Sequence, residues 1–214
     1  HLPVAQVRNL ELSGIVRRQG AEKLAGLAEA DLGQLRIDDE WFTFCSGTLI
    51  DEDVVLTAGH CTNLGGTWTT SGGQTIGPVA ASSFPGNDFG AIRISNPAAL
   101  DPRGGVLHYG AFRDITGAGR VPVGGSACKT GSTTGTTCGT VQAYNVTVRY
   151  AEGTVSGLTR TNICTQPGDS GGPMYYNNLA QGITSGGTIG GCSQPGFQSF
   201  FQPADEALSA YGLT

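Results

Sequence analysis

Two short stretches of the sequence contain residue types that can carry out nucleophilic catalysis. "TAGHC" places His60 beside Cys61, and "QPGDSGG" places Ser170 among glycines. A serine hydroxyl is a weak nucleophile at its free pKa, so a neutral imidazole must accept its proton, and a buried carboxylate must hold that imidazole in one tautomer. Most single histidines are structural, so the order of the serine and a carboxylate along the chain decides whether His60 is a candidate base.

Chain order separates two motifs that Ser170 satisfies. The serine fits G-x-S-x-G, the strand-to-helix turn of α/β-hydrolases, and it also fits G-D-S-G-G, the nucleophile loop of chymotrypsin-like proteases. An α/β-hydrolase has its histidine after the serine, but all histidines of this chain precede Ser170, at positions 1, 60 and 108. The esterase or lipase interpretation therefore lacks a base, whereas the order histidine, aspartate, serine is met by His60.

An aspartate must lie between His60 and Ser170 in this order. Asp88 follows the turn "FPGN" and opens the expected strand "FGAIRIS", so its carboxylate can be fixed at the end of a rigid element. Asp101 and Asp114 are expected to be solvated turn residues, and Asp169 adjoins the serine and cannot easily reach the far side of the imidazole. The predicted catalytic residues are His60, Asp88 and Ser170.

The glycines around the serine predict an oxyanion hole. Gly168 and Gly171 let the backbone approach a substrate closely, so the amides of Gly168 and Ser170 can point at the developing oxyanion. Each such donor contributes about 3 kcal/mol to stabilising the transition state.

Composition excludes several classes of protein. The chain has 214 residues, a formal net charge of -5 and only 14% charged residues, which offers no basic surface for nucleic acid or an anionic membrane. No apolar run approaches the roughly 20 residues of a membrane span. The amino terminus has no signal-like apolar region, and we expect a mature, processed chain. The sequence contains no metal or organic cofactor motif, and we expect a monomer.

The even number of cysteines predicts disulfides. Six cysteines allow 15 connectivities, and sequence alone does not choose among them, although joining nearest neighbours closes the shortest loops. A zinc site is disfavoured because the chain has no C-x-x-C and only His60 lies near a cysteine. Disulfides persist in oxidising compartments, which predicts a secreted protein. The cysteines are Cys45, Cys61, Cys128, Cys138, Cys164 and Cys192.

From residue 41 onward, short extended runs separated by Gly, Asn, Ser and Pro predict an all-β protein. Expected strands are "WFTFCSGTLI", "DVVLTA", "FGAIRIS", "GTVQAYNVTVRYA", "GPMYY", "AQGITSGG" and "FQSFFQP". The alternation over residues 141–150 is typical of a half-exposed strand. "PADEALSAYGL" predicts a short terminal helix, and "GAEKLAGLAEADLGQL" predicts an amphipathic helix with Leu24, Leu27, Ala28, Leu32 and Leu35 on one face.

The sequence from Cys45 to the end resembles the trypsin and chymotrypsin clan, and within it the bacterial secreted branch of streptogrisins and α-lytic endopeptidase. "FPGNDFGAIRI", "CKTGSTTGTTCGTV", "NVTVRYAEGTVSGLTRTNIC", "PGDSGGPMYY", "GITSGG" and "FFQPADEALSAYGL" carry the resemblance. It implies two perpendicular six-stranded antiparallel β-barrels with a short C-terminal helix. We expect residues 41–110 to form the first barrel, with His60 and Asp88, and residues 111–214 to form the second, with Ser170. Residues 1–40 do not match this branch, and we expect them to pack on the protease as a segment without an assigned role. "CSGTLI" resembles the wider clan instead. "SGIV" lies inside the chain, so we do not expect activation by a freed amino terminus.

The resemblance also implies roles for further residues. It supports nearest-neighbour disulfides and, by analogy with an arginine of the branch, an ion pair between Asp169 and Lys129. It implies protein or peptide substrates and, as further candidate partners, proteinaceous protease inhibitors. It places the pocket for the residue before the scissile bond, the P1 residue, against the segment before Ser170 and against Thr184, Ser185, Gly186 and Gly187.

The sequence predicts an apolar P1 residue. From residue 161 to residue 204 the only charged side chain is Asp169, so a charged P1 side chain would lose its water without gaining a partner. We expect cleavage after Phe, Tyr, Leu or Met, unless Phe197 enters the pocket and favours small residues.

Two further interpretations remain open. One is a catalytically inactive, protease-like binding protein; such proteins usually lack a triad member, whereas this chain keeps all three candidates. The other concerns the sequon "NVT" at Asn145, which permits N-glycosylation but is more simply an exposed strand residue.

Overall fold

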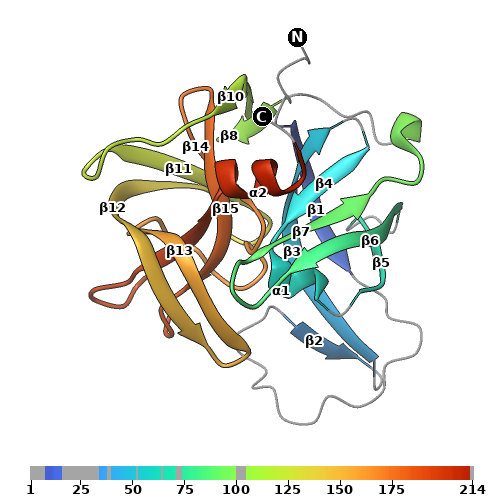
Figure 1. The fold of residues 1–214 in the computed structure, drawn as a ribbon, viewed down its shortest axis with the longest axis horizontal. Coiled ribbons are helices and arrows are strands. Elements are labelled where there is room, and N and C mark those ends of the chain that lie inside the picture. Colours follow the sequence, from blue (N-terminus) through green and yellow to red (C-terminus); the bar gives the residue numbers. More distant parts are fainter. Residues whose placement is uncertain are drawn as a thin grey trace.

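The computed structural model describes residues 8–15, 34–37, 40–51, 53–63, 65–70, 74–99 and 105–212. Most of these residues lie in strands, as the spacing of apolar and turn residues predicts. Two seven-stranded sheets lie side by side, and a short helix, α2 (Ala204–Ala210), lies where they meet (Figure 1).

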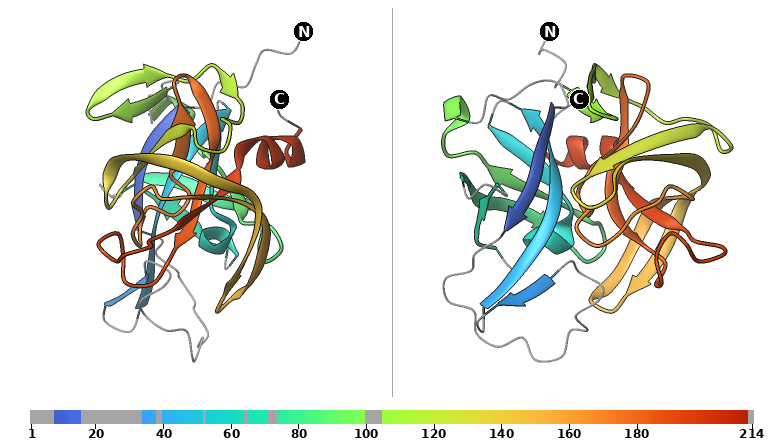
Figure 2. Two further views of the ribbon diagram at one scale, coloured as in Figure 1. Left: turned by 90° about the vertical axis from the view of Figure 1, so that its left-hand side faces the viewer. Right: turned by 180° about the vertical axis from the view of Figure 1, so that it is seen from behind.

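The first sheet is built by the amino-terminal half of the chain. Its strands are β1 (Arg8–Ile15), β2 (Gln34–Ile37), β3 (Glu40–Asp51), β4 (Val54–Thr57), β5 (Thr67–Thr69), β6 (Thr75–Ser83) and β7 (Phe89–Arg93). Six of them follow the order β1-β3-β4-β7-β6-β5, and β2 pairs with β3 beside this path. Seen from behind, β1 lies along β3 (Figure 2). The described parts of residues 1–40 therefore extend the first barrel.

The second sheet is a closed barrel. Its strands are β10 (Gly117–Ala118), β11 (Ser126–Gly131), β12 (Gly135–Tyr150), β13 (Gly153–Thr161), β14 (Pro173–Tyr176), β15 (Leu179–Gly187) and β16 (Ser199–Pro203). Six strands follow the order β15-β14-β11-β12-β13-β16, and the pairing of β15 with β16 closes them. β10 adds to β15 in parallel.

Three short elements complete the described fold. A separate hairpin consists of β8 (Gly105–His108) and β9 (Ala111–Asp114). The single-turn helix α1 (Gly59–Thr62) follows β4, and a 3-10 turn covers Pro97–Ala99.

Each barrel has its own core, and a third cluster joins the two barrels. The first core contains the completely buried side chains of Trp68, Val55 and Ile92. The second core contains the buried ring of Phe201. Between the barrels, residues of both pack with two residues of α2, so burial of this apolar surface holds the barrels together. This joining cluster consists of Ile50, Leu56, Phe89, Ile183, Ala207 and Leu208.

The predicted all-β fold with a terminal helix is confirmed, but two local expectations are wrong. Residues 34 and 35, expected at the end of an amphipathic helix, lie in β2 and pair with β3; residues 20–33 of that expected helix lie outside the described part. In β12 the alternation of exposed and half-buried residues holds from Tyr144 to Tyr150, but Val141 is completely buried. The pairing register shifts between Ala143 and Val146, where Asn145 has a positive φ of 56°. Before the shift the odd-numbered residues, such as Val141, are the less exposed ones, and after it they are the more exposed ones.

Candidate active site

Strand pairing in the first barrel brings His60 and Asp88 together. His60 lies in α1 directly after β4, and Asp88 directly precedes β7. β4 and β7 are antiparallel neighbours, with Thr57 opposite Gly90, so the end of one strand meets the start of the other. Gly59 makes this approach possible, because a Cβ there would lie 2.6 Å from the Ser83 carbonyl oxygen.

The Asp88 carboxylate is completely buried and binds His60 through two groups. His60 Nδ1 lies 3.0 Å from Asp88 Oδ1 and 2.9 Å from Oδ2, and the His60 backbone N–H donates to Oδ1 at 2.8 Å. A carboxylate only accepts hydrogen bonds, so this contact keeps the proton on Nδ1 and leaves Nε2 free to act as a base. Burial alone lowers the pKa of His60, but the charge and hydrogen bond of Asp88 outweigh burial and raise that pKa above 6.5.

A hydroxyl group of the second barrel also binds the Asp88 carboxylate. Ser185, in β15, donates a short hydrogen bond to Asp88 Oδ2. The Tyr150 hydroxyl lies 3.0 Å from Ser185 Oγ, and burial raises the pKa of this phenol. A protonated Tyr150 can therefore donate to Ser185 while Ser185 donates to Asp88. Ser185 was predicted only as a residue of the substrate pocket, and no sequence motif indicated Tyr150 as a site residue.

The nucleophile loop rests against the first barrel. Gly171 has a φ of 80°, and a Cβ there would lie 2.3 Å from the Ser46 carbonyl oxygen, so only glycine fits this close approach. The Ser46 backbone N–H donates to the Ser170 carbonyl at 2.7 Å, and Ser46 Oγ donates to the Gly168 carbonyl at 2.9 Å. These contacts fix the loop that carries Ser170.

Two amides of the loop can bind a substrate oxygen. Among the residues that the structure describes, none accepts a hydrogen bond from the backbone N–H of Gly168 or Ser170. Both are the amides predicted for the oxyanion hole. The other amides of the loop donate within the protein; they belong to Gln166, Asp169, Gly171 and Gly172.

Asp169 is held by a buried ion pair and not by the histidine. Lys129 Nζ lies 3.0 Å from Asp169 Oδ2, and both side chains are completely buried. Burial lowers the pKa of Lys129, although the Asp169 charge opposes this. Four further donors bind the same carboxylate, namely the backbone N–H groups of Thr133, Thr134 and Gln166 and the hydroxyl of Thr134.

His60 and Ser170 both line a cavity of about 590 Å³. The first barrel contributes His60 and Phe84, and the second contributes residues 148–152, 165–167 and 184–191. Among the described contacts, no direct hydrogen bond joins His60 to Ser170; such contacts often tighten only when substrate binds. Arg149 and Glu152, which no sequence motif indicated, also line this cavity.

The side chains of Thr165 and Phe197 lie close to Gly187, and of the two only Thr165 lines the cavity. A Cβ on Gly187 would lie 3.0 Å from Thr165 Oγ1 and 3.1 Å from Phe197 Cζ. A Cβ on Gly186 would lie 2.9 Å from the Tyr150 ring. Glycine at both positions therefore lets Tyr150, Thr165 and Phe197 pack close to the backbone of β15.

The remaining candidates lie elsewhere. Asp114 is exposed in β9, and Asp101 falls outside the described residues. His108 lies in β8, where its Nδ1 is 3.0 Å from the Tyr175 hydroxyl. Asn145 is exposed on β12.

All six cysteines form disulfides between nearest neighbours. The bonds join Cys45 to Cys61, Cys128 to Cys138, and Cys164 to Cys192. Cys45 and Cys61 lie near His60, but their sulfurs are bonded to each other and offer no thiolate to a metal ion.

Two β-barrels with a histidine and a serine on the cavity between them, and a buried aspartate bound to the histidine, are the arrangement of chymotrypsin-like serine proteases. A model of the family "Trypsin" matches residues 30–210. The chain belongs to the trypsin family.

Bacterial proteases are among its relatives. Streptogrisin-A of Streptomyces griseus is 49% identical over 160 residues, which are 74% of this chain and 51% of that protein. Streptogrisin-C of the same organism is 40% identical over 224 residues, which are 99% of this chain and 48% of that protein. The chain thus spans about half the length of each. Because the second alignment covers nearly the whole chain, the view that residues 1–40 do not match this branch is wrong.

Solved structures with the same fold include proteases of different specificity. Cellulomonas bogoriensis chymotrypsin is 43% identical, with a TM-score of 0.65 over 75% of this chain and 85% of that chain. A glutamic acid specific serine protease that uses a histidine triad in substrate binding is 38% identical, with a TM-score of 0.70 over 85% of this chain and 97% of that chain. Among the described residues, no helix is long and apolar enough to cross a membrane.

Proposed function

We propose that this chain is an active, secreted serine endopeptidase that uses His60, Asp88 and Ser170. The observation that carries the proposal is the buried His60–Asp88 contact on the same cavity as Ser170. The three disulfides and the secreted character of the resembling branch support an extracellular location.

Each step of peptide hydrolysis has a residue suited to it. His60 Nε2 accepts the proton of Ser170 Oγ as this oxygen attacks the scissile carbonyl, and the N–H groups of Gly168 and Ser170 bind the resulting oxyanion. Asp88 stabilises the imidazolium, which then gives its proton to the leaving amine. Water, activated in the same way by His60, hydrolyses the acyl-enzyme and restores Ser170.

For the P1 residue we propose Phe, Tyr, Leu or Met. Gly186 and Gly187 line the cavity and add no side chains of their own to it, and burial of a large apolar P1 side chain there contributes about 2 kcal/mol. The charged side chains that line the cavity, Arg149 and Glu152, lie outside residues 184–187, against which we place the P1 pocket. A glutamate pocket built from histidines is disfavoured, because His60 alone among the described histidines lines the cavity.

An inactive binding protein is the alternative function. It is disfavoured because the chain keeps the buried His60–Asp88 contact and two loop amides without an acceptor among the described residues, which binding alone does not require. An esterase would use the same groups on a different substrate, so the assay must separate amide from ester hydrolysis.

Labelling with a sulfonyl fluoride together with casein hydrolysis tests the proposal. We expect the wild type to be labelled at Ser170 and to hydrolyse casein, and Ser170→Ala to lose both. Absence of both in the folded wild type would favour the binding protein. Labelling with hydrolysis of esters but not of casein would favour an esterase.

A further inference from the structure

Gln202 connects the second barrel to the backbone of Asp88. It lies in β16, is completely buried, and its Oε1 accepts a hydrogen bond from the Asp88 backbone N–H at 2.8 Å. The two residues are 114 positions apart in the sequence. This bond satisfies an amide that lies just before β7 and that burial would otherwise leave without an acceptor.

Glu206 determines which way the Gln202 amide points. Gln202 Nε2 donates to Glu206 Oε2 at 2.9 Å, from the first turn of α2. A carboxylate only accepts, so it attracts the NH₂ group and directs the carbonyl oxygen towards Asp88. A rotated amide would place its oxygen against the carboxylate and its NH₂ against the Asp88 N–H, two repulsive contacts.

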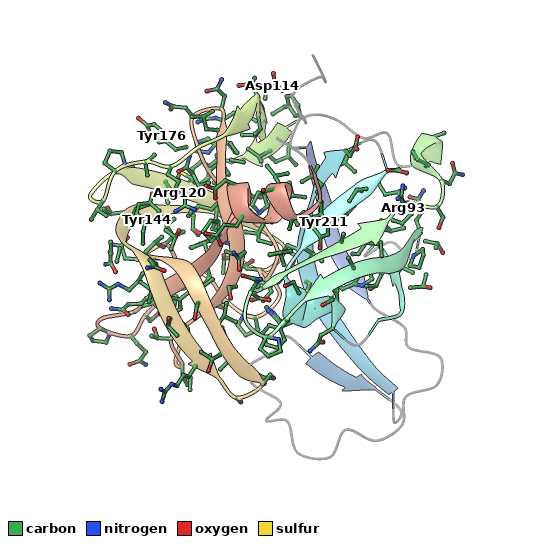
Figure 3. The ribbon with its side chains drawn as sticks, viewed as in Figure 1. Arg93, Asp114, Arg120, Tyr144, Tyr176 and Tyr211 are labelled. Atoms are coloured by element: carbon green, nitrogen blue, oxygen red, sulfur yellow. A yellow bond between two sulfur atoms is a disulfide. The ribbon has the colours of Figure 1, made fainter. Side chains whose placement is uncertain are left out.

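Arg120 in turn fixes the Glu206 carboxylate. Its Nη2 lies 3.2 Å from Glu206 Oε1 and 2.9 Å from Asp205 Oδ1, and its Nε donates to Asp205 Oδ2 at 3.1 Å. The side chain of Arg120 lies beside α2 and close to Tyr144 (Figure 3). Asp205 shares the arginine but has no described contact with Gln202.

We propose that Gln202, oriented by Glu206, is a positioning residue that sets the place of Asp88 relative to His60. The inference rests on the proposed function, because it concerns the aspartate of the proposed triad. The Asp88 carboxylate is held by His60 and Ser185, and Gln202 anchors the backbone from which it projects. Loss of the anchor allows the carboxylate to shift, and a misplacement of about 1 Å can cost about 10²-fold in rate.

Glu206→Ala tests the inference on the surface of the protein, with Asp205→Ala as the matched control. Both variants remove one carboxylate from the same turn of α2. Asp205→Ala removes two hydrogen bonds of Arg120 and Glu206→Ala removes one, but only Glu206→Ala frees the Gln202 amide. With rates normalised to titrated active sites, we expect Glu206→Ala to lower kcat about tenfold with KM unchanged. Asp205→Ala should keep the wild-type kcat, and Glu206→Gln, which retains an acceptor, should recover most of the loss.

The pH profile of kcat/KM separates positioning from a general loss of stability. The charged groups that act on His60 are Asp88 and Glu152, and neither variant removes them. If Asp88 shifts away, it stabilises the imidazolium less, and the apparent pKa of the acidic limb falls in Glu206→Ala but not in Asp205→Ala. Gln202→Met removes the amide itself. In the folded fraction of this variant, the apparent pKa of the acidic limb should fall in the same way.

Each result decides the inference. Equal kcat and equal pH profiles for the two alanine variants, with an active wild type, would overturn the positioning role and leave the endopeptidase intact. A lower melting temperature of Glu206→Ala with an unchanged kcat per active site would also overturn it, since the contact would then be only structural. A wild type that neither hydrolyses peptides nor reacts with the titrant would overturn the proposed function, and the positioning role with it.

Discussion

Ser185 of the second barrel donates a hydrogen bond to the buried carboxylate of Asp88, which belongs to the first barrel. The two residues are 97 positions apart. The orientation of the carboxylate that faces His60 therefore depends on both barrels, and the cluster of apolar residues between the barrels keeps them in place.

Ser185→Ala should lower kcat about tenfold, because it removes a hydrogen bond to a charged group, worth about 1.5–3 kcal/mol. Peptide anilide hydrolysis per titrated active site measures the effect. Thr130→Val is the control: it removes another buried hydroxyl of the second barrel, one that donates to the Leu107 carbonyl. We expect Thr130→Val to lose stability with little change in kcat; equal losses of kcat would remove the special role of Ser185.

Asp88→Asn should lower kcat by about 10⁴ and leave the fold unchanged. Such a loss follows in a Ser-His-Asp triad when the carboxylate is replaced by an amide that favours the wrong imidazole tautomer. Steady-state kinetics and circular dichroism measure the two effects. A loss below tenfold would assign the role to another carboxylate.

The rate should depend on the protonation of His60. Because the raised pKa belongs to a base that must be neutral, kcat/KM should rise with pH through an apparent pKa somewhat above 6.5 and then level off. A profile of kcat/KM against pH measures this, and an optimum near pH 4 would contradict a histidine base.

The same pKa shift affects stability in the opposite direction. A raised pKa in the folded state means that protonated His60 stabilises the fold. The contribution is complete below the unfolded-state pKa of about 6.5 and is lost as pH rises through the folded-state pKa. In the inactive Ser170→Ala background, urea unfolding should therefore show a larger stability advantage of His60 over His60→Phe at pH 5.5 than at pH 8.5.

Lys129→Met should destabilise the fold by about 3–5 kcal/mol, because it leaves the buried Asp169 charge without its cation. Arg93→Met is the control, since it breaks the exposed pair of Arg93 and Asp53 and should cost less than about 1 kcal/mol. Urea unfolding in the Ser170→Ala background measures both. Equal, small losses would mean that the other donors to Asp169 replace the lysine.

The P1 preference should reflect the space beside Phe197. On peptide anilides that differ only at P1, we expect the fastest turnover for Phe, Tyr, Leu or Met. Phe197→Ala should raise the turnover of peptides with a large P1 residue relative to peptides with alanine at P1, because it removes the ring beside Gly187. Fastest wild-type turnover on Ala would show that Phe197 fills the pocket, and fastest turnover on Lys, Arg or Glu would contradict the apolar pocket.

Local patterns were enough to predict the triad candidates and the fold class. "TAGHC" and "PGDSGG" are continuous in sequence, and the order of His60, Asp88 and Ser170 excluded an α/β-hydrolase without any structure. Strands from Trp41 onward and the terminal helix followed from periodicity, which depends only on neighbouring residues. The alternation in β12 failed where a bulge at Asn145 shifted the register, because a bulge has no periodic signal.

Only the tertiary structure decided which distant side chains meet. Nothing near Gln202 or Ser185 in the sequence indicates that both bind Asp88, and nothing near Tyr150 indicates that it lies against Gly186. How the loop folds against Ser46 also decided that the amides of Gly168 and Ser170 have no acceptor among the described residues. Such contacts depend on the register of strands and the packing of one barrel on the other, and these are set by the whole core and not by any short stretch of chain.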